Sequence, residues 1–326
     1  MTKGLLTTTV GSFAKPEYLQ RARNRHASGK VSAAELDRLT LQATKEVIAV
    51  QEQLGLDVLV HGEMERGDMV AYFAEHMPGM QTGELVRSYG NRYYHKPIIG
   101  GELQWDVPIT VATWKYAQSL TKKPVKGMLT GPYTMVEWSF DEHYGSRRDA
   151  VLGMAKVLHK EAQALAKAGA KVIQVDEPAI HTRPEEDFDL AVKAMEVVVK
   201  GVDAEFHTHI CYGDIPRIYP GMLRLPVKQI HLAFKNTNFE LLRLFEKVPF
   251  DRSKELGLGV IDVHNHNVEA VKEVRDGIRK ALKYVPPDRL WIEPDCGLKT
   301  RTPEEVRAKL GVMVSARDEV RGAVRA

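Results

Sequence analysis

The chain contains only two cysteines, and each follows an apolar run that is typical of a β-strand. Cys211 closes the run 204–211, and Cys296 follows the run 290–295. His209 stands two residues before Cys211, so on a strand its imidazole and the thiol point to the same face. Two thiolates and an imidazole are a zinc ligand set, and zinc held by sulfur is suited to activating another thiol. We therefore predict that His209, Cys211 and Cys296 bind Zn²⁺.

Other groups that can ligate, protonate or hydrogen-bond also follow predicted strands. They include Ser12, Glu63, His264 and the adjacent acids Asp176 and Glu177. In a (β/α)₈ barrel the catalytic groups collect at the carboxyl ends of the strands, which favours a functional role for these residues. The two adjacent acids have two interpretations, because they can cap a helix or bind a substrate. The sequence leaves both open.

The elements that position these residues are short apolar, β-branched runs, most of them followed by a helical pattern. Their alternation predicts parallel strands, and eight units in about 300 residues fit a single (β/α)₈ TIM barrel. A doubly wound open sheet is the alternative, weakened because the chain has no glycine-rich nucleotide turn. An inserted loop or hairpin over one barrel face is predicted around 79–108, and 1–326 is treated as one catalytic domain. The eight runs are 5–9, 58–63, 125–131, 171–177, 204–211, 228–234, 258–264 and 290–295.

The composition excludes several classes of protein. The formal charge is +3, from 46 basic and 43 acidic residues, which argues against nucleic-acid binding. The chain has neither an N-terminal signal pattern nor an apolar run near the ~18 residues of a membrane span. Two cysteines cannot build a disulfide framework, and reduced thiols suit metal ligation. We expect a soluble, cytoplasmic, globular protein that binds neither nucleic acid nor membrane.

In their order along the chain, these motifs resemble the cobalamin-independent methionine synthase family. The resemblance covers nearly the whole chain but only the family's C-terminal catalytic barrel; the family's N-terminal barrel, which helps hold polyglutamylated methyl-folate, has no counterpart here. Eight motifs carry it, at 7–13, 60–70, 88–99, 131–140, 174–179, 209–211, 262–264 and 294–301.

The resemblance implies a role for each matching residue. Val10, Gly11 and Ser12 match the strand that holds the homocysteine carboxylate. Glu63 matches the acid that holds the homocysteine amine, and Asp176 matches the shared aspartate turn. We expect both acids to bind the ammonium group of L-homocysteine.

The remaining motifs concern the methyl donor, the proton and the metal. Arg92, Tyr93 and Trp138 match segments that line the methyl-donor site. His264 matches the histidine proposed in the family as proton donor, and it forms the expected catalytic pair with Asp176. The family's zinc motifs coincide with the three ligands predicted above.

Two positions depart from the family pattern. An acid that contacts the pterin in the folate enzymes falls at Thr182, and the usual glutamate zinc ligand falls at Ala233. The fourth zinc position would then be filled by His231, a water or the substrate thiolate.

The single-barrel form resembles the short core methionine synthases. That resemblance implies methylcobalamin or a methylated corrinoid protein as methyl donor, rather than methyl-folate. Because a cobalt leaving group needs no proton, His264 is then expected to orient ligands more than to donate a proton. The predicted activity is zinc-dependent methyl transfer to L-homocysteine, which forms L-methionine.

Two alternatives remain at this level. One keeps the fold and the zinc but transfers an alkyl group to another small thiol, such as coenzyme M. Glu63 and Asp176 argue against it, because they suit an ammonium group that coenzyme M lacks. The other alternative is a non-catalytic, zinc-stabilised module that binds a corrinoid protein.

Overall fold

The computed structural model describes residues 4–87 and 93–325, and the chain divides into two compact units. The second unit is inserted twice into the sequence of the first. The first unit consists of Met1–Glu65, Thr113–Lys126 and Gln229–Ala326, and the second of Arg66–Ala112 and Gly127–Lys228.

The first unit contains four parallel strands. Their side chains are buried almost without alternation, as expected for parallel strands that are covered on both faces. The pairing between the strands Glu255–Ile261 and Leu290–Pro294 shifts register between Gly259 and Ile261, shortly before the loop that carries His264. In spatial order the strands are β1 (Leu6–Thr7), β12 (Leu290–Pro294), β11 (Glu255–Ile261) and β10 (Gln229–Ala233).

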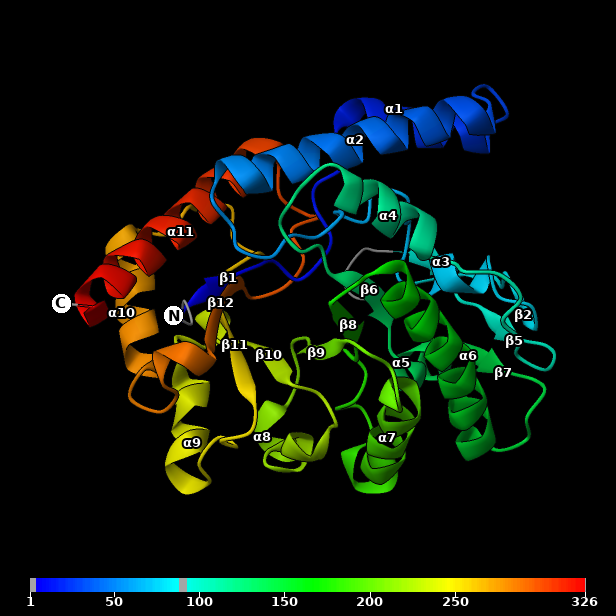
Figure 1. The fold of residues 1–326 in the computed structure, drawn as a ribbon. Coiled ribbons are helices and arrows are strands. Elements are labelled where there is room, and N and C mark those ends of the chain that lie inside the picture. The colour runs from blue at the N-terminus through cyan, green and yellow to red at the C-terminus, as the bar shows by residue number, and fades with distance from the viewer. Residues whose placement is uncertain (1–3, 88–92, 326) are drawn as a thin grey trace. The chain divides into compact units, whose positions relative to one another are not determined.

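The two longest helices of the first unit begin with capping residues of the usual kind. The Ser32 side chain accepts a hydrogen bond from the Glu35 amide at the start of α2 (Ala33–Gln53). Thr302 and Glu305 cap α11 (Pro303–Arg325) reciprocally. In Figure 1, α11 (red) lies beside α10 (Val271–Ala281) and against β12. The other helices are α1 (Glu17–Ala27), α9 (Leu244–Lys247), η2 (Lys235–Thr237), η3 (Glu240–Arg243), η4 (Pro287–Arg289) and, from Thr113 onward, α4 (Val111–Ser119).

The second unit contains three parallel strands and two small sheets. The parallel strands follow the order β9 (Glu205–Ile210), β8 (Val172–Asp176), β6 (Gly127–Thr130). One small sheet joins β2 (Met80–Gln81), β5 (Ile98–Ile99) and β7 (Phe140–Asp141).

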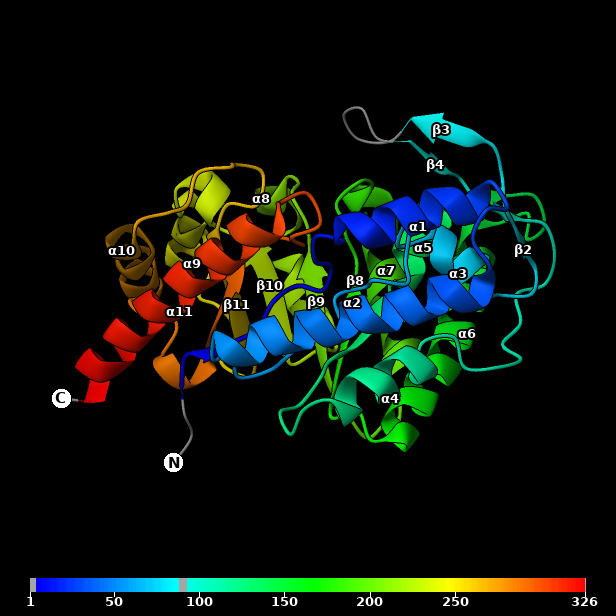
Figure 2. The same cartoon turned by 90° about the horizontal axis from the view of Figure 1, so that it is seen from above.

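The other small sheet confirms the hairpin predicted within 79–108. Strands β3 (Leu85–Arg87) and β4 (Tyr93–His95) pair antiparallel, and Figure 2 shows them as a separate cyan ribbon. The turn between them, 88–92, lies outside the described residues.

Two long helices dominate the second unit. Helix α6 (Arg147–Ala168) begins at Ser146, whose side chain caps the Asp149 amide, and ends at Gly169, where φ is 112°. Helix α7 (Pro184–Val199) packs along it. The shorter helices are α3 (Ala71–Ala74), α5 (Pro132–Glu137), α8 (Ile215–Ile218) and η1 (Gly221–Arg224).

Seven of the eight predicted strands are present, and the eighth is reduced to a single bridge. Leu59 pairs parallel with Val125 at one position within the predicted run 58–63. The run is short because Gly62 (φ 85°) and Glu63 (φ 56°) adopt the left-handed conformation, which a strand does not accommodate. The fold is therefore mixed α/β; among the described residues, four parallel strands are assigned in the first unit and three in the second.

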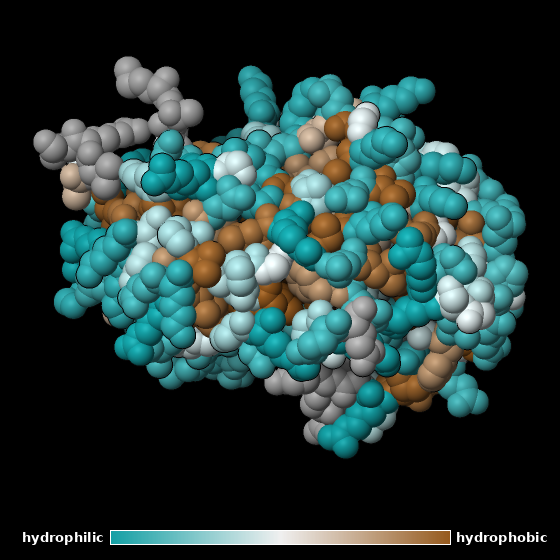
Figure 3. Space-filling view, turned by 90° about the horizontal axis from the view of Figure 1, so that it is seen from below, coloured by the Kyte–Doolittle hydropathy of each residue, from teal (hydrophilic) through white to brown (hydrophobic). Residues whose placement is uncertain are grey.

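The helices bear on the expectation that no segment of the chain spans a membrane. Among the described residues, no helix combines the length and the apolar composition of a membrane span. On the face seen in Figure 3, hydrophilic residues in teal surround scattered apolar residues in brown.

Candidate active site

In the first unit, the loop after β1 touches the loop after β12. The Leu298 amide donates a hydrogen bond of 2.7 Å to the Ser12 carbonyl oxygen. A Cβ atom at Gly297 would lie 2.1 Å from the Ser12 hydroxyl oxygen, so only glycine fits there. Cys296 directly precedes this glycine, and the structure therefore brings the predicted carboxylate-binding serine and one predicted zinc ligand together. Val10 and Gly11, in the same loop as Ser12, are buried.

Glu63 occupies a strained turn beside the Ser12 loop. A left-handed conformation at a residue other than glycine costs about 1–2 kcal/mol. Two hydrogen bonds hold it, from the Phe13 amide to the Gly62 carbonyl (3.0 Å) and from the Glu63 amide to His61 Nδ1 (3.2 Å). Strain that is held in this way is typical of functional sites.

Lys15 is a residue of this site that the sequence did not identify. Its ammonium donates a hydrogen bond of 3.1 Å to the Glu63 carbonyl oxygen. Burial, helped by the positive charge of Arg23, lowers the pKa of Lys15 to about 8. No pattern around Lys15 in the sequence marks it, because the contact joins two loops that lie 48 residues apart.

His264 lies in the exposed loop that follows β11. Its amide donates to Asp262 Oδ1 (2.8 Å), and the Asp262 amide donates to Glu269 Oε1 (2.8 Å). The Thr300 hydroxyl donates to the Val263 carbonyl (3.4 Å), which links this loop to the loop of Cys296. The predicted proton donor thus sits on a loop whose backbone is held by acids at both ends.

Asp295, at the end of β12, is fully buried and structural. Its carboxylate accepts hydrogen bonds from the amides of Lys235 (3.0 Å) and Asn236 (2.8 Å) at the start of η2. Burial raises the pKa of Asp295 to about 7. The residue that follows it, Cys296, is therefore anchored from the strand side.

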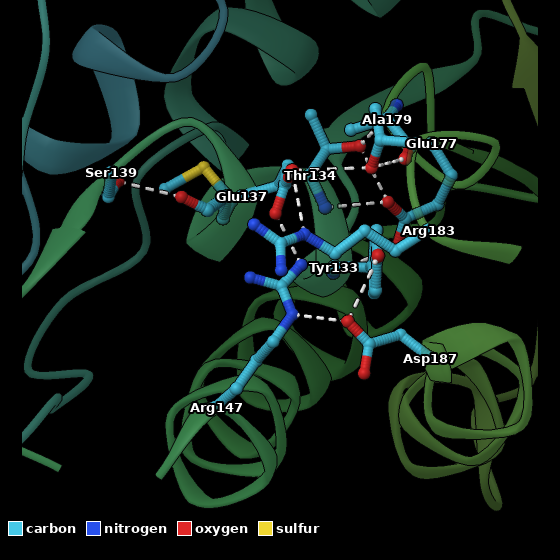
Figure 4. A network of polar contacts seen from close by, with 11 residues as sticks. Tyr133, Thr134, Glu137, Ser139, Arg147, Glu177, Ala179, Arg183 and Asp187 are labelled. Carbon is cyan, nitrogen blue, oxygen red and sulfur yellow. Dashed lines mark hydrogen bonds and ion pairs between the residues drawn. The ribbon is translucent and has the colours of Figure 1, made fainter. Parts of the chain in front are cut away.

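In the second unit, Glu177 is a helix cap, which decides one of the two interpretations left open by the sequence. Its carboxylate accepts hydrogen bonds from the amides of Tyr133 (3.1 Å) and Thr134 (2.8 Å) and from the Thr134 hydroxyl (2.7 Å), as Figure 4 shows. Burial raises the pKa of Glu177 to about 7. A Cβ atom at Gly131 would lie 2.1 Å from the Glu177 carboxyl carbon, so the cap also requires this glycine.

The same helix, α5, is held from its other side by an ion-pair network. Arg147 contacts Glu137 and Asp187, and its guanidinium lies over the Tyr133 ring, 4.9 Å from the centroid. Figure 4 shows Arg183 reaching the same Glu137. Burial lowers the pKa of Arg147, but the Tyr133 hydroxyl and the two acids outweigh that effect and raise it.

Asp176 and the predicted ligands of β9 lie on neighbouring strands of the second unit. Asp176, 7 % exposed, ends β8 and accepts a hydrogen bond of 2.7 Å from the Gln174 amide group. His209 is buried in β9, and its carbonyl accepts a hydrogen bond of 3.0 Å from the Glu177 amide. Cys211 follows the strand directly, and both cysteines of the chain are free thiols. The structure thus brings Asp176 and His209 to adjacent strand ends.

The three residues predicted for the methyl-donor site differ in their placement. Trp138 ends α5, and its carbonyl accepts a hydrogen bond of 3.4 Å from the Tyr94 hydroxyl of β4. Tyr93, the neighbour on β4, is 60 % exposed. Arg92 lies outside the described residues. The described contact between β4 and Trp138 is therefore made by Tyr94.

In parallel α/β folds the catalytic groups collect at the carboxyl ends of the strands, and here these ends carry thiols, imidazoles and acids. The sequence model described as "Cobalamin-independent synthase, Catalytic domain" matches residues 5–319, and the chain belongs to this family.

Relatives with known names agree with the family. The chain is 41 % identical over 318 residues to a protein of Saccharolobus solfataricus named "Methionine synthase", covering 97 % of this chain and 95 % of that one. It is 40 % identical over 296 residues to the "Methionine synthase" of Sulfolobus acidocaldarius, covering 90 % and 86 %. A B12-independent methionine synthase from Shewanella sp. W3-18-1, solved with selenomethionine, aligns with a TM-score of 0.88 at 28 % identity, covering 99 % of each chain.

These findings correct the expected methyl donor. Methylcobalamin or a methylated corrinoid protein was predicted, but the family is cobalamin-independent and uses methyl-folate. The predicted corrinoid partner and the corrinoid-binding module are overturned with it. The prediction rested on Thr182 and on a resemblance that covers only the family's C-terminal barrel. It was wrong because neither observation identifies a group that binds cobalt.

Proposed function

We propose that the protein is a zinc-dependent methyltransferase that transfers a methyl group from a methyl-folate to the thiol of L-homocysteine and forms L-methionine. The observation that carries this proposal is the family match over residues 5–319, which includes every predicted strand-end residue. The names of the relatives support the reaction and the acceptor.

His209, Cys211 and Cys296 are the residues that would hold the zinc. Their one nitrogen and two sulfurs are a known zinc donor set. Neither thiol is part of a disulfide. Ala233, which the resemblance places in the family's fourth-ligand position, is buried and offers no ligand atom, so His231, a water or the substrate thiolate would complete the shell. The chemistry that zinc supplies in such a site is deprotonation of a bound thiol, and the thiolate is the nucleophile.

The first task of the protein's own residues is to hold the amino-acid part of homocysteine. Ser12, with the backbone at Val10 and Gly11, binds the substrate carboxylate. Glu63 and Asp176 bind the ammonium group, because both are carboxylates in the motifs that match the family's amine-binding acid and its aspartate turn. Holding both ends of the substrate fixes its sulfur for in-line attack, and orientation of this kind supplies a large part of the rate.

The second task is to release the pterin. The bond between the methyl carbon and the pterin nitrogen breaks as the carbon–sulfur bond forms, and the nitrogen needs a proton to leave. His264 supplies that proton as a general acid. The resemblance assigns Arg92, Tyr93 and Trp138 to segments that line the site of the methyl donor.

We further propose that the strands close into the (β/α)₈ barrel predicted from the sequence. The parallel bridge between Leu59 and Val125 supports a short eighth strand. A protein of Listeria monocytogenes described as "Putative Vitamin-B12 Independent Methionine Synthase" aligns with a TM-score of 0.80 at 20 % identity, which supports the fold alone.

Turnover tests the proposed function. Zinc-loaded protein is incubated with homocysteine and methyl-folate, and both methionine and demethylated folate are measured. The proposal predicts that the two products form in equal amounts. Cys296→Ser serves as the inactive control, because it keeps the fold and removes one sulfur. A folded, zinc-loaded protein that forms no methionine from methyl-folate contradicts the proposal.

A further inference from the structure

Helix α11 carries a buried lysine that the proposed function does not use. Lys309 has no exposed surface, although it is a charged residue. Its ammonium donates to Glu269 Oε2 (3.0 Å), to the Asp262 carbonyl (3.1 Å) and to the Asn267 carbonyl. A buried ammonium is tolerated when its protons find acceptors, and here three protons meet three acceptors.

The partner of Lys309 completes a clamp on the loop of His264. The second oxygen of Glu269 accepts a hydrogen bond of 2.8 Å from the Asp262 amide. The ion pair of Lys309 and Glu269 therefore fixes both the N–H and the C=O of Asp262, where the loop begins. It also fixes Asn267, where the loop ends.

One helical turn earlier, α11 holds the same loop by a weaker, exposed contact. Glu305 and Lys309 are four residues apart and so lie on one face of the helix. Glu305 pairs with His266 Nδ1 at 2.7 Å, but the His266 side chain is 72 % exposed. Exposed pairs contribute little, so this contact is a natural control for the buried one.

We propose that Lys309 is a positioning residue, whose buried pair with Glu269 fixes the loop so that His264 can deliver its proton to the pterin nitrogen. The inference rests on the proposed function and deepens it. Fold stability alone does not account for the pair, because apolar side chains of similar size stabilise a core as well as a buried ion pair does. What apolar side chains cannot do is hold the loop backbone by its polar groups at both ends.

The test compares single and double variants of the pair. Lys309→Met alone leaves the Glu269 carboxylate buried without its cation and lowers the melting temperature. The double variant Lys309→Met/Glu269→Met removes both charges and regains most of that stability. Its kcat nevertheless falls by about 10²-fold, the cost expected for a misplaced catalytic group, while the KM for homocysteine and the zinc content stay unchanged. His266→Ala leaves kcat within about twofold, since it removes the exposed partner of that pair and leaves Glu305 in the cap of α11.

Two further measurements separate this inference from the proposed function. His264→Asn must itself lower kcat, and its effect must shrink in the double variant, where the loop is already displaced. Amide hydrogen exchange at Asp262 and His264 must become faster in the double variant, whether or not methyl-folate is the donor. A stable double variant with wild-type kcat, or with unchanged exchange at these two amides, overturns the role of Lys309. A wild-type protein that is inactive with methyl-folate overturns the donor instead, and the exchange experiment still decides the loop.

Discussion

Two strand ends, one in each unit, carry buried acids with the same task. Glu177 follows β8 and caps the start of α5, and Asp295 follows β12 and caps the start of η2. Burial raises the pKa of both carboxyls to about 7. The two differ in what comes next, since Pro178 follows the first acid and Cys296 follows the second.

The comparison shows how to separate structural from functional acids at strand ends. The carboxylates of Glu177 and Asp295 accept hydrogen bonds from backbone amides at the start of a neighbouring helix. Asp176 instead accepts a hydrogen bond from the side chain of Gln174, and the backbone of Glu63 is strained. An acid in the functional position is therefore recognised by its contacts and not by its place in the sequence. The predictions below test this division, from the largest expected effect to the smallest.

Loss of a zinc ligand has the largest expected effect. Cys296→Ser replaces a thiolate by a hydroxyl that ligates zinc weakly, so bound zinc and turnover fall by orders of magnitude. Zinc is measured by elemental analysis after dialysis, and turnover by methionine formation. Stoichiometric zinc with full activity in this variant would remove Cys296 from the site.

Substitution of a capping acid comes next and acts on stability. Glu177→Gln replaces one carboxylate oxygen by an NH₂ group, which is itself a donor, beside the amides of Tyr133 and Thr134 and the Thr134 hydroxyl. The free energy of unfolding therefore falls by about 1–3 kcal/mol. Asp295→Asn has an effect of the same size for the same reason. The exposed Glu185→Gln is the control and stays within about 0.5 kcal/mol. Urea unfolding measures all three, and unchanged stability in Glu177→Gln breaks the division drawn above.

Substitution of a substrate-binding acid acts on binding instead. Glu63→Gln keeps the size of the side chain and removes the charge that pairs with the substrate ammonium. The KM for homocysteine rises by about 10–100-fold, equivalent to roughly 1.4–2.8 kcal/mol of charge-assisted binding, while stability changes by less than about 0.5 kcal/mol. Steady-state kinetics and unfolding on the same preparation decide this. A variant that unfolds but binds homocysteine normally would place Glu63 among the structural acids.

The smallest effect concerns pH and Lys15. The pKa of Lys15 is lowered from 10.5 to about 8, so between these values the unfolded chain holds a proton that the folded protein has lost. Stability contributed by this group therefore rises with pH across that interval, by about 1–3 kcal/mol. Lys15→Met abolishes the rise, which urea midpoints at pH 8 and 10 compare directly. An equal rise in both proteins would show that other groups produce it.

Local periodicity was enough to predict the parts of the molecule that depend on it. The two-residue spacing of His209 and Cys211 predicted their placement at the end of β9, and seven of the eight apolar runs became strands. The run at 58–63 did not, because Gly62 and Glu63 adopt the left-handed conformation. The hydrogen bonds that hold them, to the Phe13 amide and the His61 ring, are visible only in the structure.

Contacts between residues far apart in the chain could not be predicted from the sequence. Glu177 and the amides that it caps are 43 and 44 residues apart, and Lys309 and Glu269 are 40 apart, so no local pattern reports either contact. The methyl donor was predicted wrongly. The prediction rested on the chain length and on one residue, Thr182, and neither of them identifies a group that binds a corrinoid.

The most direct test of the account is the zinc coordination shell, measured by X-ray absorption before and after homocysteine is added. The account predicts two sulfurs and one imidazole nitrogen from the protein, with a third sulfur appearing when homocysteine binds. A shell that is unchanged by homocysteine would contradict it, because the zinc would then be a closed structural site and the thiol would have to be activated elsewhere.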